Sequence, residues 1–121
     1  GNELWLGTGG TESNLHFSKD MGATWEKHKT PFIQGESSQG IFSIASMGKG
    51  EIIAVGGDYL NEEMQEGIAG IFVSSKKEWV KPQQGPGGYR SGDGFHAVKM
   101  GHADGSVWAS GAKGKIAKLK Y

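Results

Sequence analysis

The chain has 121 residues, of which 22 are glycine, three are proline and none is cysteine. Glycine at about 18 % is more than twice ordinary usage, but it does not recur at every third position, which excludes collagen. Twelve aromatic residues (four Trp, three Tyr, five Phe) spread along the chain argue against disorder, and thirteen basic residues balance thirteen acidic ones. Because the formal net charge is zero, overall charge does not attract the chain to nucleic acid or to an anionic membrane surface.

The length suits one domain, and the absence of cysteine excludes disulfides, thiolate nucleophiles and cysteine metal ligands. The longest apolar runs, such as residues 52–55, have four or five residues, so we expect no membrane insertion. The sequence does not begin with the charged segment and following apolar stretch that are typical of a signal peptide. The compartment is left open by these features.

Short apolar runs rich in β-branched and aromatic residues alternate with turns that contain glycine, which is typical of β-strands. In chain order, strands are predicted over residues 4–6, 15–17, 41–45, 52–55, 70–73, 95–100, 107–109 and 115–119. Only residues 61–65 are a candidate for a helical turn, and their polarity favours an exposed loop equally. The sequence therefore predicts an all-β fold.

An internal repeat organises these strands. Residues 40–44 (Gly-Ile-Phe-Ser-Ile) recur 54 positions later as residues 94–98 (Gly-Phe-His-Ala-Val), and Trp25 and Trp79 have the same spacing. Three imperfect units result, over approximately 1–34, 35–88 and 89–121. A four-stranded antiparallel unit repeated in this way is typical of a β-propeller blade, and the chain contains about two and a half blades.

Since propellers usually have four to eight blades, we expect residues 1–121 to be part of a larger propeller domain, as its C-terminal piece. If the chain is complete, its open blade faces predict a homo-oligomer, with two copies giving a ring of about six blades.

One short segment specifies a turn chemistry. Residues 18–25 read Ser-Lys-Asp-Met-Gly-Ala-Thr-Trp, which matches Ser-x-Asp-x-Gly-x-Thr-Trp at every specified position. Asp20 is expected to accept backbone N–H bonds across the turn, Gly22 to take a positive φ, and Ser18 and Thr24 to bond locally. Trp25 is expected to cover the hairpin with its ring. Residues 74–79 keep the Ser and Trp of this pattern but lack its Asp and Gly.

The segment at residues 18–25 resembles the Asp-box, or BNR repeat, of sialidase-like propellers and of propellers related to a photosystem II stability and assembly factor. Residues 40–45, 54–59, 88–91 and 110–119 resemble uncharacterised bacterial members of this group. The resemblance implies a structural role for Ser18, Asp20, Gly22, Thr24 and Trp25, away from the central site. It also implies a bacterial protein, for which an extracytoplasmic location is one expectation. The resemblance implies the fold more strongly than the function.

Candidate ligand-binding residues lie elsewhere in the repeats. Tyr89 and Arg90 follow a glycine-rich connection, where they either line a pocket for a carboxylate or sugar or occupy an inter-blade loop. Asp58 and Tyr59 follow a double glycine at a strand end, the rim where propeller ligand sites form. The acidic loop after Tyr59 lacks the alternating spacing of a calcium site, and the four histidines show no zinc-ligand spacing, so no metal is expected.

A sialidase requires three arginines around the substrate carboxylate, and this chain has Arg90 alone. We therefore expect a non-enzymatic binding or scaffold module for a glycan or a protein, without cofactor, metal or catalytic residues. One alternative is a glycoside hydrolase-like enzyme whose catalytic residues lie partly outside this chain, with Asp58 and Glu36 as the carboxylates to test. Another is a protein-complex assembly factor.

Overall fold

The computed structural model describes residues 2–10, 14–30, 39–58, 67–80, 90–91, 95–101, 103–111, 114 and 116–119. These residues form twelve β-strands and no α-helix, which confirms the all-β prediction. The strands are β1 (Leu4–Gly7), β2 (Gly9–Gly10), β3 (Asn14–Ser18), β4 (Glu26–Lys29), β5 (Gln39–Gly48), β6 (Glu51–Asp58), β7 (Gly67–Val73), β8 (Glu78–Val80), β9 (Arg90–Ser91), β10 (Phe95–Met100), β11 (Val107–Gly111) and β12 (Ile116–Leu119).

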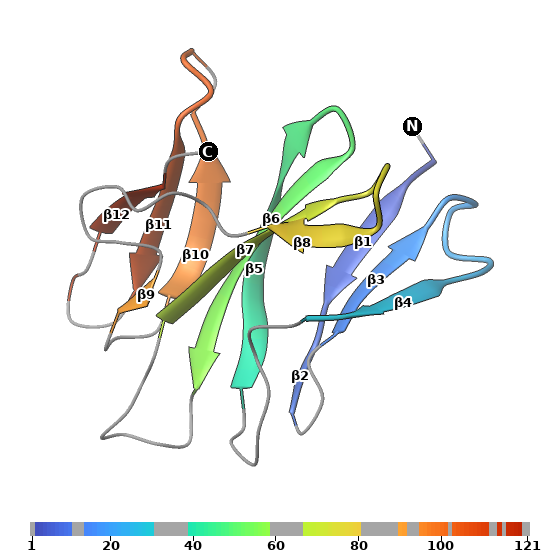
Figure 1. The fold of residues 1–121 in the computed structure, drawn as a ribbon, viewed down its shortest axis with the longest axis horizontal. Coiled ribbons are helices and arrows are strands. Elements are labelled where there is room, and N and C mark those ends of the chain that lie inside the picture. Colours follow the sequence, from blue (N-terminus) through green and yellow to red (C-terminus); the bar gives the residue numbers. More distant parts are fainter. Residues whose placement is uncertain are drawn as a thin grey trace.

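The strands form three antiparallel sheets, which lie side by side with the largest in the middle (Figure 1). The first sheet has the order β1-β3-β4, and the third has the order β10-β11-β12. The central sheet contains the four-stranded meander β5-β6-β7-β8, with β2 added beside β5 and β9 beside β7. Each expected repeat thus contributes one sheet, although β2 and β9 pair outside the repeats that contain them.

All eight predicted strands are present, and residues 61–65, the candidate helical turn, lie outside the described residues. Four strands were not predicted: β2, β4, β8 and β9. The strand β4 reads Glu-Lys-His-Lys and lies at the edge of its sheet, so it is specified by its pairing with β3 and not by apolar side chains.

Strands β5 and β10, which are related by the 54-residue repeat, each have a register shift at the same place. The register between β5 and β6 shifts between Ile41 and Ser43, and the register between β10 and β11 shifts between Phe95 and Ala97. Each β-bulge places residues three apart on the same side of the strand. As a result Phe95 and Val98 both enter the core between the central and third sheets.

The central sheet separates two hydrophobic cores because side chains alternate between its faces. One face packs Ile53, Val55, Ala69 and Ile71 against the third sheet. The other face contacts the first sheet, and its buried core consists of Leu15, Ile41, Ile52, Ala54 and Phe72. Trp5 of β1 joins this core, with its ring 5.9 Å from the ring of Phe72. The sheets are therefore stacked face to face.

Gly56 allows β5 and β6 to approach closely beside the bulge. A Cβ atom at this position would overlap the carbonyl oxygen of Gly40 and would lie 3.2 Å from Cα of Ile41. A glycine is therefore required here by backbone contact.

Candidate functional site

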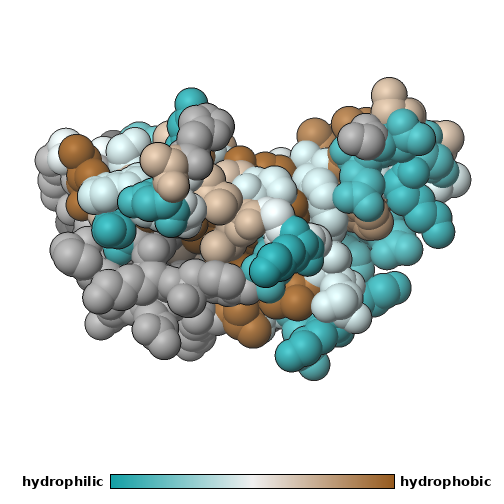
Figure 2. Space-filling view, turned by 90° about the horizontal axis from the view of Figure 1, so that it is seen from above, coloured by the Kyte–Doolittle hydropathy of each residue, from teal (hydrophilic) through white to brown (hydrophobic). Residues whose placement is uncertain are grey.

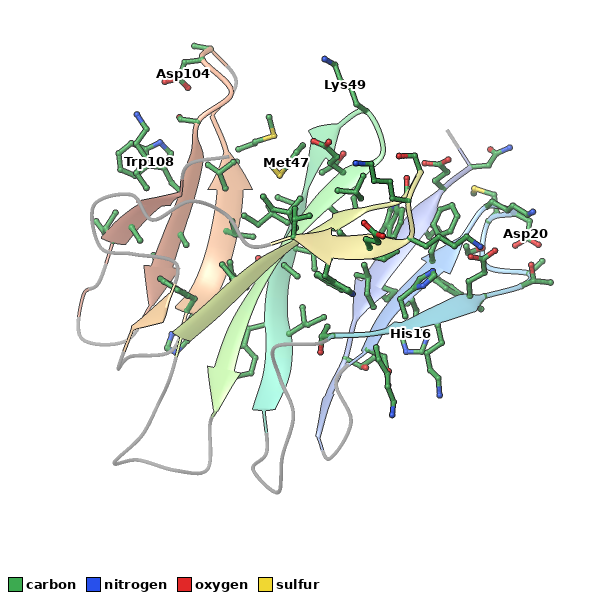
Figure 3. All side chains as sticks on the ribbon, viewed as in Figure 1. His16, Asp20, Met47, Lys49, Asp104 and Trp108 are labelled. Carbon is green, nitrogen blue, oxygen red and sulfur yellow. The ribbon has the colours of Figure 1, made fainter. Side chains whose placement is uncertain are left out.

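The turn between β3 and β4 is closed by one carboxylate. Asp20 Oδ1 accepts hydrogen bonds from the backbone N–H of Thr24 and from the hydroxyl of Ser18, each at 2.8 Å. Its other oxygen, Oδ2, accepts from the Thr24 hydroxyl at 2.5 Å. Ser18 in turn accepts the backbone N–H of Gly22 at 2.8 Å. The network joins both ends of the hairpin turn, at the far tip of the first sheet (Figure 3).

These donors favour the charged form of Asp20. The hydroxyl of Thr24, then its backbone N–H, then the hydroxyl of Ser18 lower the pKa of the carboxyl from its ordinary value of 3.8 to about 2. All three donors belong to residues of the turn itself, Ser18 and Thr24. The carboxylate therefore acts as a structural acceptor, since proton transfer near neutral pH requires a pKa near the working pH.

Trp25 is fixed against the same turn. Gly22 has a φ of 91°, the positive value expected of it, and its carbonyl oxygen accepts a hydrogen bond from Trp25 Nε1 at 3.1 Å. The Trp25 residue remains 40 % exposed. Although Trp25 and Trp79 are separated by the 54-residue repeat, they occupy different positions, because Trp25 precedes β4 whereas Trp79 lies within β8, opposite Phe72. The two-residue deletion in the second turn shifts its tryptophan into the strand and toward the core.

A shallow pocket of about 280 Å³ lies beside this hairpin, lined by Phe17, Lys19, Thr24, Trp25 and Glu26. One ring of the pocket is held by its cross-strand neighbour, since Phe17 stacks on Trp5 with ring centroids 4.3 Å apart. Glu26 Oε2 lies 3.7 Å from Lys77 Nζ and 3.5 Å from His28 Nε2. The pocket thus combines aromatic rings with an acidic and a basic side chain, an arrangement that suits a ligand with both apolar and polar faces.

A second carboxylate closes the turn between β10 and β11. Asp104 Oδ1 accepts the backbone N–H of Ser106 at 3.0 Å and its hydroxyl at 2.6 Å. Ser106 Oγ accepts from Trp108 Nε1 at 2.8 Å, so the chain of bonds orients an exposed indole. The Ser106 hydroxyl and then its backbone N–H lower the pKa of Asp104. This network was not predicted from the sequence, although the Asp-Gly-Ser run at residues 104–106 is a turn signal.

Two of the expected ligand-binding residues, Asp58 and Arg90, have their backbone at one end of the central sheet. Asp58 ends β6 and pairs with Gln39, while Arg90 of β9 pairs with Ile68 of β7. The backbone therefore brings Asp58 and Arg90 to the same sheet, and their side chains lie outside the described part. Tyr59, Tyr89 and Glu36 also lie outside the described residues.

Within the described residues, no three His, Asp or Glu side chains gather as a set of metal ligands. The same part of the chain contains no helix with the length and apolar character needed to cross a membrane.

In comparisons with known proteins, no family model, no curated protein and no solved structure matches the chain. The chemistry of the two hairpins and the pocket is therefore the basis for assigning a function.

Proposed function

We propose that the chain is a non-enzymatic, propeller-type binding module that recognises carbohydrate in the pocket beside the β3–β4 hairpin. The observation that carries the proposal is the Trp25 ring, which lines this pocket and is held by its hydrogen bond to Gly22. A fixed aromatic surface loses little conformational freedom when a ligand binds.

The stacking of the sheets supports the propeller part of the proposal. In a propeller, four-stranded sheets pack face to face around an axis. Here β5 and β10, the strands that open the central meander and the third sheet, contact each other, and the N–H of Val98 donates to Ser43 Oγ at 3.1 Å. The central meander β5-β6-β7-β8 has the four strands of one blade.

The composition of the pocket supports carbohydrate as the ligand. A sugar ring presents C–H groups on its faces and hydroxyls around its rim, so it needs an aromatic surface together with hydrogen-bond donors and acceptors. Trp25 and Phe17 supply the aromatic surface, Lys19 supplies a donor and Glu26 supplies an acceptor. The Asp20 network holds the backbone between Lys19 and Trp25, which fixes the spacing of these groups.

A glycan array, followed by titration calorimetry with the oligosaccharides that bind, tests this proposal. We expect Trp25→Ala to weaken binding at least about tenfold, because an aromatic anchor in a pocket contributes much of the binding free energy. Lys19→Gln should weaken binding less. Lys49→Gln, at an exposed lysine in the β5–β6 turn that lies away from the Asp20 hairpin (Figure 3), is the matched control and should bind as the unsubstituted chain does.

Two outcomes would contradict the proposal. Binding that is unchanged in Trp25→Ala, with the fold intact by circular dichroism, would exclude this pocket. Release of free sugar from a bound oligosaccharide would contradict the non-enzymatic part and favour the glycoside hydrolase alternative.

A further inference from the structure

The first and third sheets each expose one face that the central sheet does not cover. On β1, Trp5 points to the central sheet, so Leu4 and Leu6 point away from it, together with their cross-strand neighbours on β3 and β4. We call this surface the N-side face, and its residues that are not buried are Leu4, Leu6, His16, Lys27 and Lys29. The C-side face is the corresponding surface of the third sheet, and its residues are Ala97, Lys99, Trp108, Ser110, Ile116 and Lys118.

Both faces carry large apolar side chains in solvent. Leu4 and Leu6 are 39 % and 52 % exposed on the N-side face, and Trp108 and Ile116 are 45 % and 68 % exposed on the C-side face. Trp108 lies on the side of β11 away from the central sheet (Figure 3). Clustered apolar groups of this kind mark contact surfaces more often than solvated ones.

The repeat indicates what each face is built to contact. Ser43 pairs with Val55 after the first bulge, and Ala97 pairs with Ser110 after the second, so Val55 corresponds to Ser110 and Ile53 to Trp108. Ile53 is fully buried against the next sheet in the chain. The C-side face therefore has the position of a surface that packs against a following sheet.

The N-side face has the opposite position. In the central and third sheets, the faces with Ile52 and Val107 pack against the sheet that precedes them in the chain. On the first sheet, the face turned away from the central sheet corresponds to this surface, and it carries Leu4 and Leu6. The N-side and C-side faces are thus the two halves of the interface that the molecule already uses twice.

We propose that the N-side face of one copy of this chain packs against the C-side face of a second copy, continuing the stack of sheets. The contact is heterologous, because two different surfaces meet, and two copies that exchange both contacts close into a ring. The proposal rests on the sheet stacking in the proposed function and not on the carbohydrate pocket. Phe17 and Glu26 of that pocket point to the other side of the first sheet from Leu6.

The charges of the two faces shape the contact. Lys27 of the N-side face lies on β4, the last strand of its sheet, whereas Lys99 of the C-side face lies on β10, the first strand of its sheet. If β1 lies over β11, Lys27 and Lys99 fall at opposite edges of the contact, whereas Lys118 of β12 falls on the same side as Lys27. Both faces are nevertheless cationic, so added salt should screen their repulsion and strengthen the association.

Analytical ultracentrifugation of the 121-residue chain tests the proposal. We expect a dimer whose dissociation constant rises at least about tenfold in Leu6→Lys and in Ile116→Lys, because each replaces an apolar contact with a further positive charge between two cationic faces. Both side chains are largely exposed, so neither change should prevent folding. Val80→Lys is the matched control, since Val80 is an exposed apolar residue of the central sheet, outside both faces.

A mixture of the two variants gives the sharpest result. The N-side face of the Ile116→Lys chain and the C-side face of the Leu6→Lys chain are both unsubstituted, so the mixture should form a heterodimer with a lower dissociation constant than either variant dimer. A monomer at all concentrations, or an association lost in only one of the two variants, would overturn the proposal. Trp25 lies close to Leu4, since a Cβ atom at Gly22 would be 3.6 Å from Trp25 Cζ2 and 3.7 Å from Leu4 Cδ1. Ultracentrifugation without carbohydrate tests the packing of the two faces, whereas the carbohydrate titration tests the pocket, so the failure of one proposal is distinguished from the failure of the other.

Discussion

At the scale of single residues, the hairpin turns depend on carboxylates that accept bonds from their own turn. Asp20 accepts two bonds from Thr24 and one from Ser18, and Asp104 accepts two from Ser106. Neither carboxylate needs burial to be effective, because the donors lie within four residues and are positioned by the turn. The free energy of each network therefore depends on the charge state of one side chain.

This dependence predicts a pH effect at Asp20. Because the folded pKa is lowered to about 2 from 3.8, the stabilisation is fully present above the higher value and is lost as the pH falls through the lower one. Asp20→Asn should lower the thermal midpoint above pH 4, and its difference from the unsubstituted chain should shrink between about pH 4 and pH 2. Thermal unfolding by circular dichroism at a series of pH values measures both midpoints.

Thr24→Val provides a second variant, since it removes the hydroxyl donor and leaves the backbone N–H bond in place. Its midpoint should lie between those of Asp20→Asn and the unsubstituted chain. An Asp20→Asn midpoint that keeps a constant offset from the unsubstituted chain over this pH range would contradict the assignment.

At the scale of the elements, the bulge near the start of β5 requires a close approach between two backbones. Ile41 pairs with Gly56 directly beside the register shift, and the carbonyl oxygen of Gly40 occupies the space of a Cβ at Gly56. The bulge and the glycine are therefore one structural unit that spans two strands.

Gly56→Ala should consequently reduce the free energy of unfolding by about 1–3 kcal/mol, the range typical of overpacking in a buried site. Urea denaturation should show a lower midpoint with an unchanged slope, because the unfolded surface stays the same. Ser110→Ala, an exposed small residue on β11, is the control and should change the free energy by no more than about 0.5 kcal/mol. Equal midpoints for the two variants would argue against the backbone overlap.

The sequence predicts the strands that enter the cores and misses those that do not. The strands β6, β7 and β10 contain β-branched and aromatic residues because their sheets bury them, and this composition is readable. The strands β4 and β8 have only three or four residues and lie at sheet edges, and their formation depends on backbone pairing with β3 and β7. Backbone pairing of such short strands leaves no periodic side-chain pattern in the sequence.

The candidate site divides in the same way. The Asp20 turn was predictable, because all its hydrogen-bond partners lie within residues 18–25. The pocket beside it was not, since it joins this turn to Phe17 and Glu26 on two strands whose side chains meet only after pairing. The 54-residue spacing of Trp25 and Trp79 does not give them the same position in the structure, because the second turn is two residues shorter than the first.

At the scale of the whole molecule, the central sheet contributes to both hydrophobic cores, one shared with the first sheet and the other with the third. Hydrophilic side chains gather over the first sheet, at the right of Figure 2, and apolar residues show between the sheets. Because the central sheet contributes to both cores, loss of its packing should weaken the whole stack.

Ile53→Ala tests this packing. Ile53 is fully buried between the central and third sheets, so the substitution should cost about 2–5 kcal/mol, and Ile53→Val about 0.5–1.5 kcal/mol. Chemical denaturation at a fixed protein concentration measures both values. Val80→Ala at an exposed position of β8 should stay within about 0.5 kcal/mol of the unsubstituted chain, and a comparable loss there would contradict the core assignment.

The alternation along β6 has a spectroscopic consequence. Ile52 and Ile53 are adjacent in the chain, yet their side chains enter different cores on opposite faces of the sheet. Methyl groups on these two residues are therefore a pair of reporters, one for each interface, carried on the same short stretch of backbone. Methyl NMR of this pair would distinguish detachment of the first sheet, which changes the Ile52 environment, from detachment of the third sheet, which changes that of Ile53.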